Sequence, residues 1–235
     1  IQVRAAAISA AFLIQRLLAD RLDIDPEEIE VARIAHRTIS PNQTIADIIL
    51  NDRLPNSAGF VMHAFNEFED ILQEACFPSV SGTYQAVIQQ ESHRHCDSSC
   101  YDCLKVYRNM SYHGLLDWRL AVSYLKTLVD PNYHAGLDGN FSTPELYGWI
   151  DTASKLRDSF IKYFNYRSVQ FAGLPGFIAG DRKFLVVHPL WNTWSASGKL
   201  VEAIVEAGGD IDRYIDTFNL LRRPGWCHEN KLNIR

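Results

Sequence analysis

The sequence lacks the features of a membrane or secreted protein. Its 235 residues contain no apolar run near the roughly 20 residues that a membrane-spanning helix needs, and no signal-peptide pattern follows Ile1. It also lacks an excess of positive charge, because 23 Lys and Arg stand against 28 Asp and Glu, for a net charge of -5. We therefore expect a soluble, cytoplasmic protein with no membrane partner, whose contacts with nucleic acid are confined to a local patch.

A phosphate-binding loop is also missing. The one Gly-Lys pair, Gly198 and Lys199, is followed by Leu200 and lacks the upstream glycine of G-x-x-x-x-G-K-[ST]. The chain opens on Ile1 and not on Met, which favours a segment of a longer protein. Any ATP-driven motor would therefore lie outside these residues.

The five cysteines are few, odd in number and unevenly spaced. Cys96, Cys100 and Cys103 fall within eight positions, whereas Cys76 and Cys227 stand apart. A disulfide scaffold is normally small, even-numbered and secreted. This chain has 47% hydrophobic residues, enough to bury a core without such bridges. The pattern favours thiolates held for a metal ion.

The spacing of the three clustered cysteines predicts a zinc site. Zinc prefers four tetrahedral N or S ligands, and the C-x2-C step of Cys100 and Cys103 turns both sulfurs toward one ion. His93 repeats the two-residue spacing ahead of Cys96 and is our first choice for the fourth ligand. The alternatives left open are His95, His113 and Cys76.

The residues around the cluster indicate a structural site. Asp97, Ser98, Ser99 and Asp102 are too polar for a core segment, which argues against buried free cysteines. No H-x-E or H-E-x-x-H pattern supplies a base beside an open coordination position. We expect bound Zn²⁺ that stabilises folding directly, and we assign no catalytic residue.

Apolar periodicity predicts a mainly helical first part. The helices expected from an i, i+3, i+4 stripe are 3–22, 60–77 and 113–129. Residues 24–34 and 44–52 are each compatible with a strand or a short helix. Turn formers at 130–142 mark a boundary, which predicts a first domain over 1–130 and a second over 142–235.

The second part changes character. Its expected elements are a helix at 144–164, two or three short strands within 169–191, a helix at 198–209 and a last strand at 213–221. We therefore predict an α+β protein, with a mainly helical zinc-binding part followed by a small α/β part.

The second part shares its element order with the core of PD-(D/E)xK nucleases. Such enzymes need an acidic residue near one strand and Glu-x-Lys on the next to hold Mg²⁺. Asp181 is a candidate for the first, but His188 stands where the carboxylate pair is required, so we expect a degenerate, inactive core. His188, Trp191 and Trp194 are compatible with base stacking, although core packing is favoured.

The residues around the cysteines also resemble a known family. The stretches HCDSSCYDCL and YRNMSYHGLLDWRLAVSYL, with the upstream turn LNDRLPNSAGF, resemble the DUF1998 family, also called the MrfA zinc-binding domain, over about residues 1–128. Members resembling the repair helicase have a fourth cysteine, which would fall at Arg94. This departure supports recruitment of a flanking histidine.

The resemblance implies a function as well as a metal. Such domains lie at the C-terminal end of DEAD/DEAH-box helicases active in DNA repair, and in anti-phage systems such as DISARM, in its DrmB subunit. The expected role is a non-catalytic zinc module that aids binding of DNA, a helicase core or a helicase subunit. The alternative is a metal-dependent nuclease or hydrolase in the C-terminal part, using Asp181.

Several basic residues are candidate phosphate contacts, although scattered surface charge is the commoner explanation. They are Lys105, Arg108 and Arg119 near the cluster, and Arg222 and Arg223 near the C-terminus. Asp117 with Arg119 is interpreted as a helix-surface pair or an intramolecular anchor.

Overall fold

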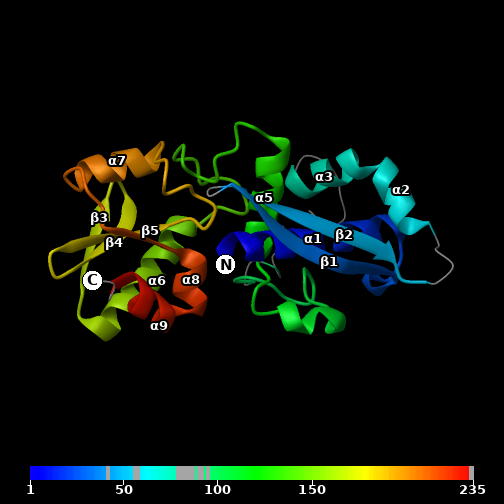
Figure 1. The fold of residues 1–235 in the computed structure, drawn as a ribbon, viewed down its shortest axis with the longest axis horizontal. Coiled ribbons are helices and arrows are strands. Elements are labelled where there is room, and N and C mark those ends of the chain that lie inside the picture. Colours follow the sequence, from blue (N-terminus) through cyan, green and yellow to red (C-terminus); the bar gives the residue numbers. More distant parts are fainter. Residues whose placement is uncertain (41–42, 55–58, 78–87, 89–92, 94–95, 233–235) are drawn as a thin grey trace. The chain divides into compact units, whose positions relative to one another are not determined.

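The computed structural model describes residues 1–40, 43–54, 59–77, 88, 93 and 96–232. The chain is α+β, as predicted, and it forms two compact units, Val3–Tyr133 and His134–Arg235 (Figure 1). Every helix in the described residues is too short or too polar to cross a membrane.

The first unit is built around helix α1, Gln2–Leu22, which confirms the first predicted helix. The helix is Ala-rich and buried on nearly all sides from Ala5 to Gln15, as expected for a helix inside a core. It ends where Asp23 adopts a left-handed conformation at φ 53° and its N–H reaches the carbonyls of the last turn. Apolar side chains of α1, α3 and α5 share one core.

A two-stranded antiparallel ribbon follows a 3-10 turn, Pro26–Glu28. Its strands are β1, Ile29–Ser40, and β2, Gln43–Asp52, with an irregularity in the register between Val31 and Arg33. The structure thus decides both open assignments in favour of strands. The Ile34 side chain of β1 and the Leu50 side chain of β2 pack against the core and are each half-buried.

The predicted long helix over 60–77 is wrong as a single helix. It is two helices, α2, Phe60–Asn66, and α3, Phe68–Cys76, separated at Glu67, whose φ of -113° and ψ of 16° are not helical. The Glu67 carboxylate lies 2.6 Å from the Arg21 guanidinium of α1 and 3.2 Å from the His63 ring. These partners hold the residue at the break, and α3 then packs against α5, Trp118–Val129.

The second unit contains a four-stranded sheet in the order β3-β4-β5-β6. The strands are Arg167–Phe171, Leu174–Ala179, Arg182–Val187 and Arg213–Asp216; the first three pair antiparallel, and β6 lies parallel to β5. Helix α7, Lys199–Glu206, lies between β5 and β6 in the chain. Helix α6, Trp149–Phe164, contributes the buried Arg157, which donates to the Val169 carbonyl at 2.8 Å.

Two element bounds in this unit differ from the predictions. Helix α6 begins at Trp149 and not near Pro144, because Gly148 takes a left-handed φ of 70° at its N-cap. The last predicted strand is short and gives way to helix α8, Thr217–Arg222, whose first turn is capped by Asp216. A helical turn Pro224–Cys227, α9, and a π-helical turn His228–Leu232 complete the described chain.

The aromatic cluster of this unit is largely core. His188 is 2% exposed and Trp191 6%, and both rings lie against Trp149, whereas Trp194 is 89% exposed. Core packing is therefore confirmed for the first two. Asp181 lies exposed in the turn between β4 and β5. A degenerate nuclease core stays a prediction.

Burial of His188 makes the stability of this unit depend on pH. Desolvation lowers the pKa of the imidazole from 6.5 to about 3, so the fold favours the neutral ring. Its contribution is fully present above pH 6.5 and is lost as the pH falls toward the folded-state value, by up to about 1.4 kcal/mol per pH unit. We expect hydrogen exchange in β5, corrected for intrinsic rates, to show this slope, and His188→Gln to remove it. An equal dependence of stability on pH in the unaltered chain and in His188→Gln would show that His188 is not the cause.

Candidate metal centre

The structure brings His93, Cys96, Cys100 and Cys103 together. One ligand atom from each lies within 4.8 Å of all the others. The Cys96 and Cys103 sulfurs are 4.0 Å apart, and those of Cys100 and Cys103 are 3.6 Å apart. Sulfurs bound tetrahedrally at about 2.3 Å from zinc stand about 3.8 Å from one another, so the observed spacings fit one ion.

The His93 ring is oriented for metal binding. Its Nδ1 lies 3.3 Å from the Ile88 carbonyl oxygen, which can only accept, so Nδ1 carries the proton. The Nε2 atom is buried and has no hydrogen-bond partner among the described residues. A histidine that donates one N–H to a carbonyl and turns its other nitrogen, unprotonated, toward thiols is the arrangement found at zinc sites.

The backbone between the cysteines folds into a tight turn. The Cys96 N–H donates to the His93 carbonyl at 2.9 Å, and the Lys105 N–H donates to the Cys100 carbonyl at 2.9 Å. The Cys100 N–H donates to the Cys103 sulfur at 3.0 Å, a charge-assisted bond once that sulfur is a thiolate. Local hydrogen bonding therefore positions the sulfurs.

The start of α5 supports the cluster from outside. The Trp118 ring packs against the His93 ring at 5.3 Å, and its Nε1–H donates to the Cys96 carbonyl at 3.3 Å. The Arg119 guanidinium donates to the carbonyls of Cys96 and Asp97, at 3.0 and 3.3 Å. Asp117 caps the helix by accepting from the Arg119 N–H at 3.1 Å. The predicted intramolecular anchor is confirmed.

Comparison with known proteins agrees with this geometry. Residues 10–104 match the MrfA Zn-binding domain. The resemblance read from the sequence is confirmed over this segment, which ends just after Cys103. The chain is also similar to the Druantia protein DruE of Escherichia coli (strain UMEA 4076-1), with 29% identity over 147 residues. That alignment covers 61% of this chain and 7% of the relative. No solved structure matches.

Within the segment that matches this family, the three thiols affect one another's pKa values. The hydrogen bond from the Cys96 thiol is the main cause that lowers the pKa of Cys103 to about 4, and it outweighs the opposing effect of burial. The same bond and burial raise the pKa of Cys96, and burial raises that of Cys100. Three thiolates this close repel one another, and a divalent cation removes the repulsion and favours deprotonation of all three. The donor set therefore fits Zn²⁺.

Two alternative fourth ligands, Cys76 and His113, lie apart from the cluster. His113 donates from Nε2 to the Asn109 side-chain oxygen at 2.8 Å and to the Val106 carbonyl at 3.1 Å. Cys76 is buried in α3, and neither residue belongs to the group of converging ligand atoms. His95 and Arg94 lie outside the described residues. Asp97 and Asp102 are exposed and do not enter the group.

Proposed function

We propose that this chain is a non-catalytic zinc-binding module of a helicase or helicase-associated protein, and that it helps to bind DNA or a partner subunit in anti-phage defence. In this proposal His93, Cys96, Cys100 and Cys103 hold one structural Zn²⁺. The observation that carries it is the closed set of four N and S ligand atoms within a segment that matches the MrfA Zn-binding domain. Similarity to a Druantia protein supports the defence context.

The domain assignment is part of the same proposal. Residues 1–130 would act as the zinc-binding domain, and 142–235 as a small α/β domain without nuclease activity. Among the described residues, the four residues of the cluster form the one group of three or more His, Cys, Asp or Glu side chains that converge on a metal position. In this proposal the zinc site and the association with a helicase belong to residues 1–130.

Zinc-dependent DNA binding by the whole chain tests the proposal. We expect the purified chain to bind labelled DNA with an affinity that falls as salt rises, and the double variant Cys100→Ser with Cys103→Ser to lose both zinc and binding. Cys227→Ser is the matched control, because this buried cysteine lies in the second unit and should leave both unchanged.

Three results would count against it. Zinc retained in full by the double variant would refute the site. Failure of the unaltered chain both to bind DNA and to bind a helicase motor would refute the role. Metal-dependent DNA cleavage that Asp181→Ala abolishes would favour the nuclease alternative.

A further inference from the structure

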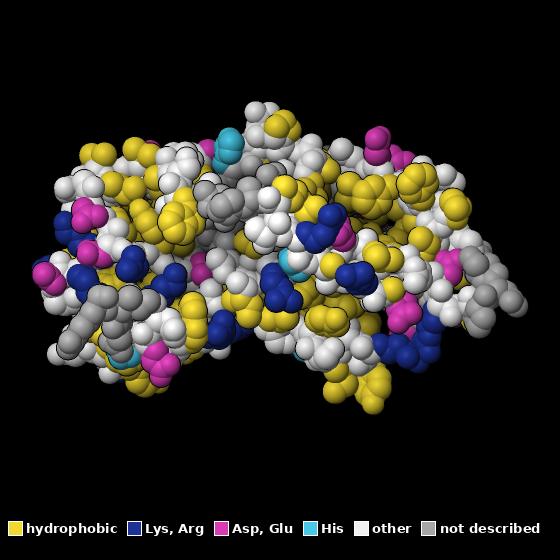
Figure 2. All heavy atoms as spheres, in the orientation of Figure 1, with side chains coloured by type: hydrophobic (Ala, Val, Ile, Leu, Met, Phe, Trp, Pro, Cys, Tyr) yellow, Lys and Arg dark blue, Asp and Glu magenta, His cyan; other side chains and the backbone are white. Residues whose placement is uncertain are grey.

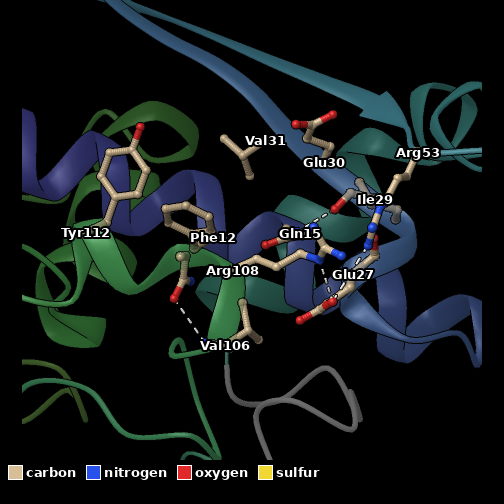
Figure 3. Close-up of a pocket in the computed structure, with 11 residues that line it drawn as sticks. Phe12, Gln15, Glu27, Ile29, Glu30, Val31, Arg53, Val106, Arg108 and Tyr112 are labelled. Atoms are coloured by element: carbon tan, nitrogen blue, oxygen red, sulfur yellow. Dashed lines mark hydrogen bonds and ion pairs between the residues drawn. The ribbon is translucent and has the colours of Figure 1, made fainter.

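A pocket in the first unit combines aromatic and charged walls. It has a volume of about 220 Å³ and lies between α1, the start of β1 and the 3-10 turn η3, Tyr107–Tyr112. Figure 3 shows Phe12 and Tyr112 at one end and Arg108, Arg53 and Glu27 at the other. The pocket is thus divided into a flat apolar end and an ionic end.

The aromatic end offers rings for stacking. The Phe12 and Tyr112 ring centroids are 5.4 Å apart at 52°, and Val31 lies beside them in the pocket wall. Tyr112 is 37% exposed, so its ring is reachable from solvent. An aromatic ring that is both anchored and exposed is a stacking surface for any flat group.

The ionic end carries an excess positive charge. The Glu27 carboxylate lies 2.6 Å from the Arg108 Nε and 3.6 Å from the Arg53 guanidinium, so two cations share one anion. The other acidic residue of the pocket, Glu30, points away from this group (Figure 3). The lining as a whole is neutral, with two arginines and two glutamates, but the group around Glu27 holds one more positive than negative charge for an anionic ligand. On the face drawn in Figure 2, Lys and Arg lie scattered among acidic and apolar side chains.

We propose that this pocket binds one unstacked nucleotide of single-stranded DNA, with the base against Tyr112 and Phe12 and a neighbouring phosphate at Arg108 and Arg53. The inference rests on the proposed role in DNA binding. The volume of the pocket is below the roughly 300 Å³ of typical small-molecule sites. This size favours one group of a longer chain over a complete free ligand. Bases and phosphates alternate along single-stranded DNA, so a base can lie at the aromatic end of the pocket while the neighbouring phosphate lies at the ionic end.

The zinc cluster is close in sequence to one wall of this pocket, the η3 turn. The η3 turn begins at Tyr107, four positions after Cys103. The Asn109 side chain ties it to the intervening segment by donating to the Leu104 carbonyl at 2.8 Å and accepting from the Val106 N–H at 3.0 Å. His113 bonds to the same Asn109 oxygen at 2.8 Å. Loss of zinc should therefore displace Arg108 and Tyr112, which gives the structural metal a direct effect on ligand binding.

The test is fluorescence anisotropy of the whole chain with a labelled oligothymidine of about 12 nucleotides, within the usual range of site sizes. We expect Tyr112→Ala to weaken binding about fivefold or more. Arg108→Gln should also weaken it and reduce the salt slope by about 0.7. Glu27→Gln should strengthen binding about twofold or more, because it releases both guanidiniums.

Opposite effects at Glu27 and Arg108 separate binding from structure, since breaking a purely structural ion pair would weaken binding in both variants. Arg37→Gln is the matched control: it removes the same charge from an exposed residue of β1 that pairs with Asp47, and it should leave affinity unchanged. Zinc content and melting temperature confirm that each variant folds.

The remaining outcomes are decisive. Unchanged binding in Tyr112→Ala and Arg108→Gln overturns the pocket assignment and leaves the DNA-binding role intact. Equal affinity for a DNA duplex also overturns the pocket assignment, because the bases of a duplex are stacked and cannot enter the pocket. Displacement of the oligonucleotide by an acidic, tyrosine-rich peptide of equal affinity would assign the pocket to a protein partner. No DNA binding by the unaltered chain overturns both this inference and the DNA role.

Discussion

Removing zinc is expected to unfold the first unit while the second keeps its structure. Structural zinc sites bind with about 10–16 kcal/mol, which is comparable to the roughly 5–15 kcal/mol stability of a whole domain. Without the ion, Cys96 and Cys100, whose pKa values are raised, return to neutral thiols, and no bond through a metal ties the sulfurs together. Cys103 and Leu104, which are 1% and 2% exposed, then lose the turn that keeps them in the core. Hydrogen exchange with and without a chelator measures the effect element by element.

The expected pattern is a loss of protection in α5 and in the η3 turn, with β5 unchanged. Cys103→Ser should reproduce the effect of the chelator, whereas Cys227→Ser should retain zinc and protection in the first unit. A chelated protein whose α5 exchanges as slowly as before would contradict a structural role for the metal.

Truncating Trp118 should be the most damaging change outside the four proposed ligands. The ring is 4% exposed, packs against His93, and supports the Arg119 guanidinium 4.4 Å above it. Trp118→Ala should cost about 3–5 kcal/mol of stability. It should also weaken zinc binding about 10- to 100-fold, since the ring orients one proposed ligand and bonds to the backbone of another. Competition with a chromophoric chelator measures the second effect.

Two comparisons make this prediction specific. Trp118→Phe keeps most of the packing but loses the hydrogen bond to the Cys96 carbonyl, so it should cost only about 1 kcal/mol. Trp191→Ala removes a similarly buried ring from the second unit and should leave zinc affinity unchanged. An equal loss of zinc affinity in Trp118→Ala and Trp191→Ala would show that global destabilisation, and not ligand support, explains the effect.

The metal cluster was predictable because its members are close in sequence. Spacings of two or three intervening residues fold back on themselves, so local turns bring His93, Cys96, Cys100 and Cys103 together. The support was not predictable in detail, because it depends on tertiary contacts. Trp118 lies 22 residues beyond Cys96, and the Ser9 hydroxyl of α1 accepts from the Asp117 N–H at 2.9 Å across 108 residues.

The errors in element bounds have the same physical origin. The apolar stripe of 60–77 runs on through Glu67, but Arg21, from a helix 46 positions earlier, holds that residue at the break. At 213–221 an apolar run did not distinguish strand from helix. There the Asp216 side chain determines the structure, because it accepts from the Asn219 N–H at 2.9 Å and caps the start of helix α8.

X-ray absorption at the zinc edge of the purified chain tests the proposed site most directly. The proposed ligands His93, Cys96, Cys100 and Cys103 predict one zinc per chain with three sulfur ligands at about 2.3 Å and one nitrogen ligand at about 2.0 Å. His93→Ala should remove the contribution of the nitrogen ligand from the spectrum. An unchanged nitrogen contribution would show that another residue supplies this ligand. A spectrum with four sulfur ligands, or a chain purified without zinc, would contradict the account.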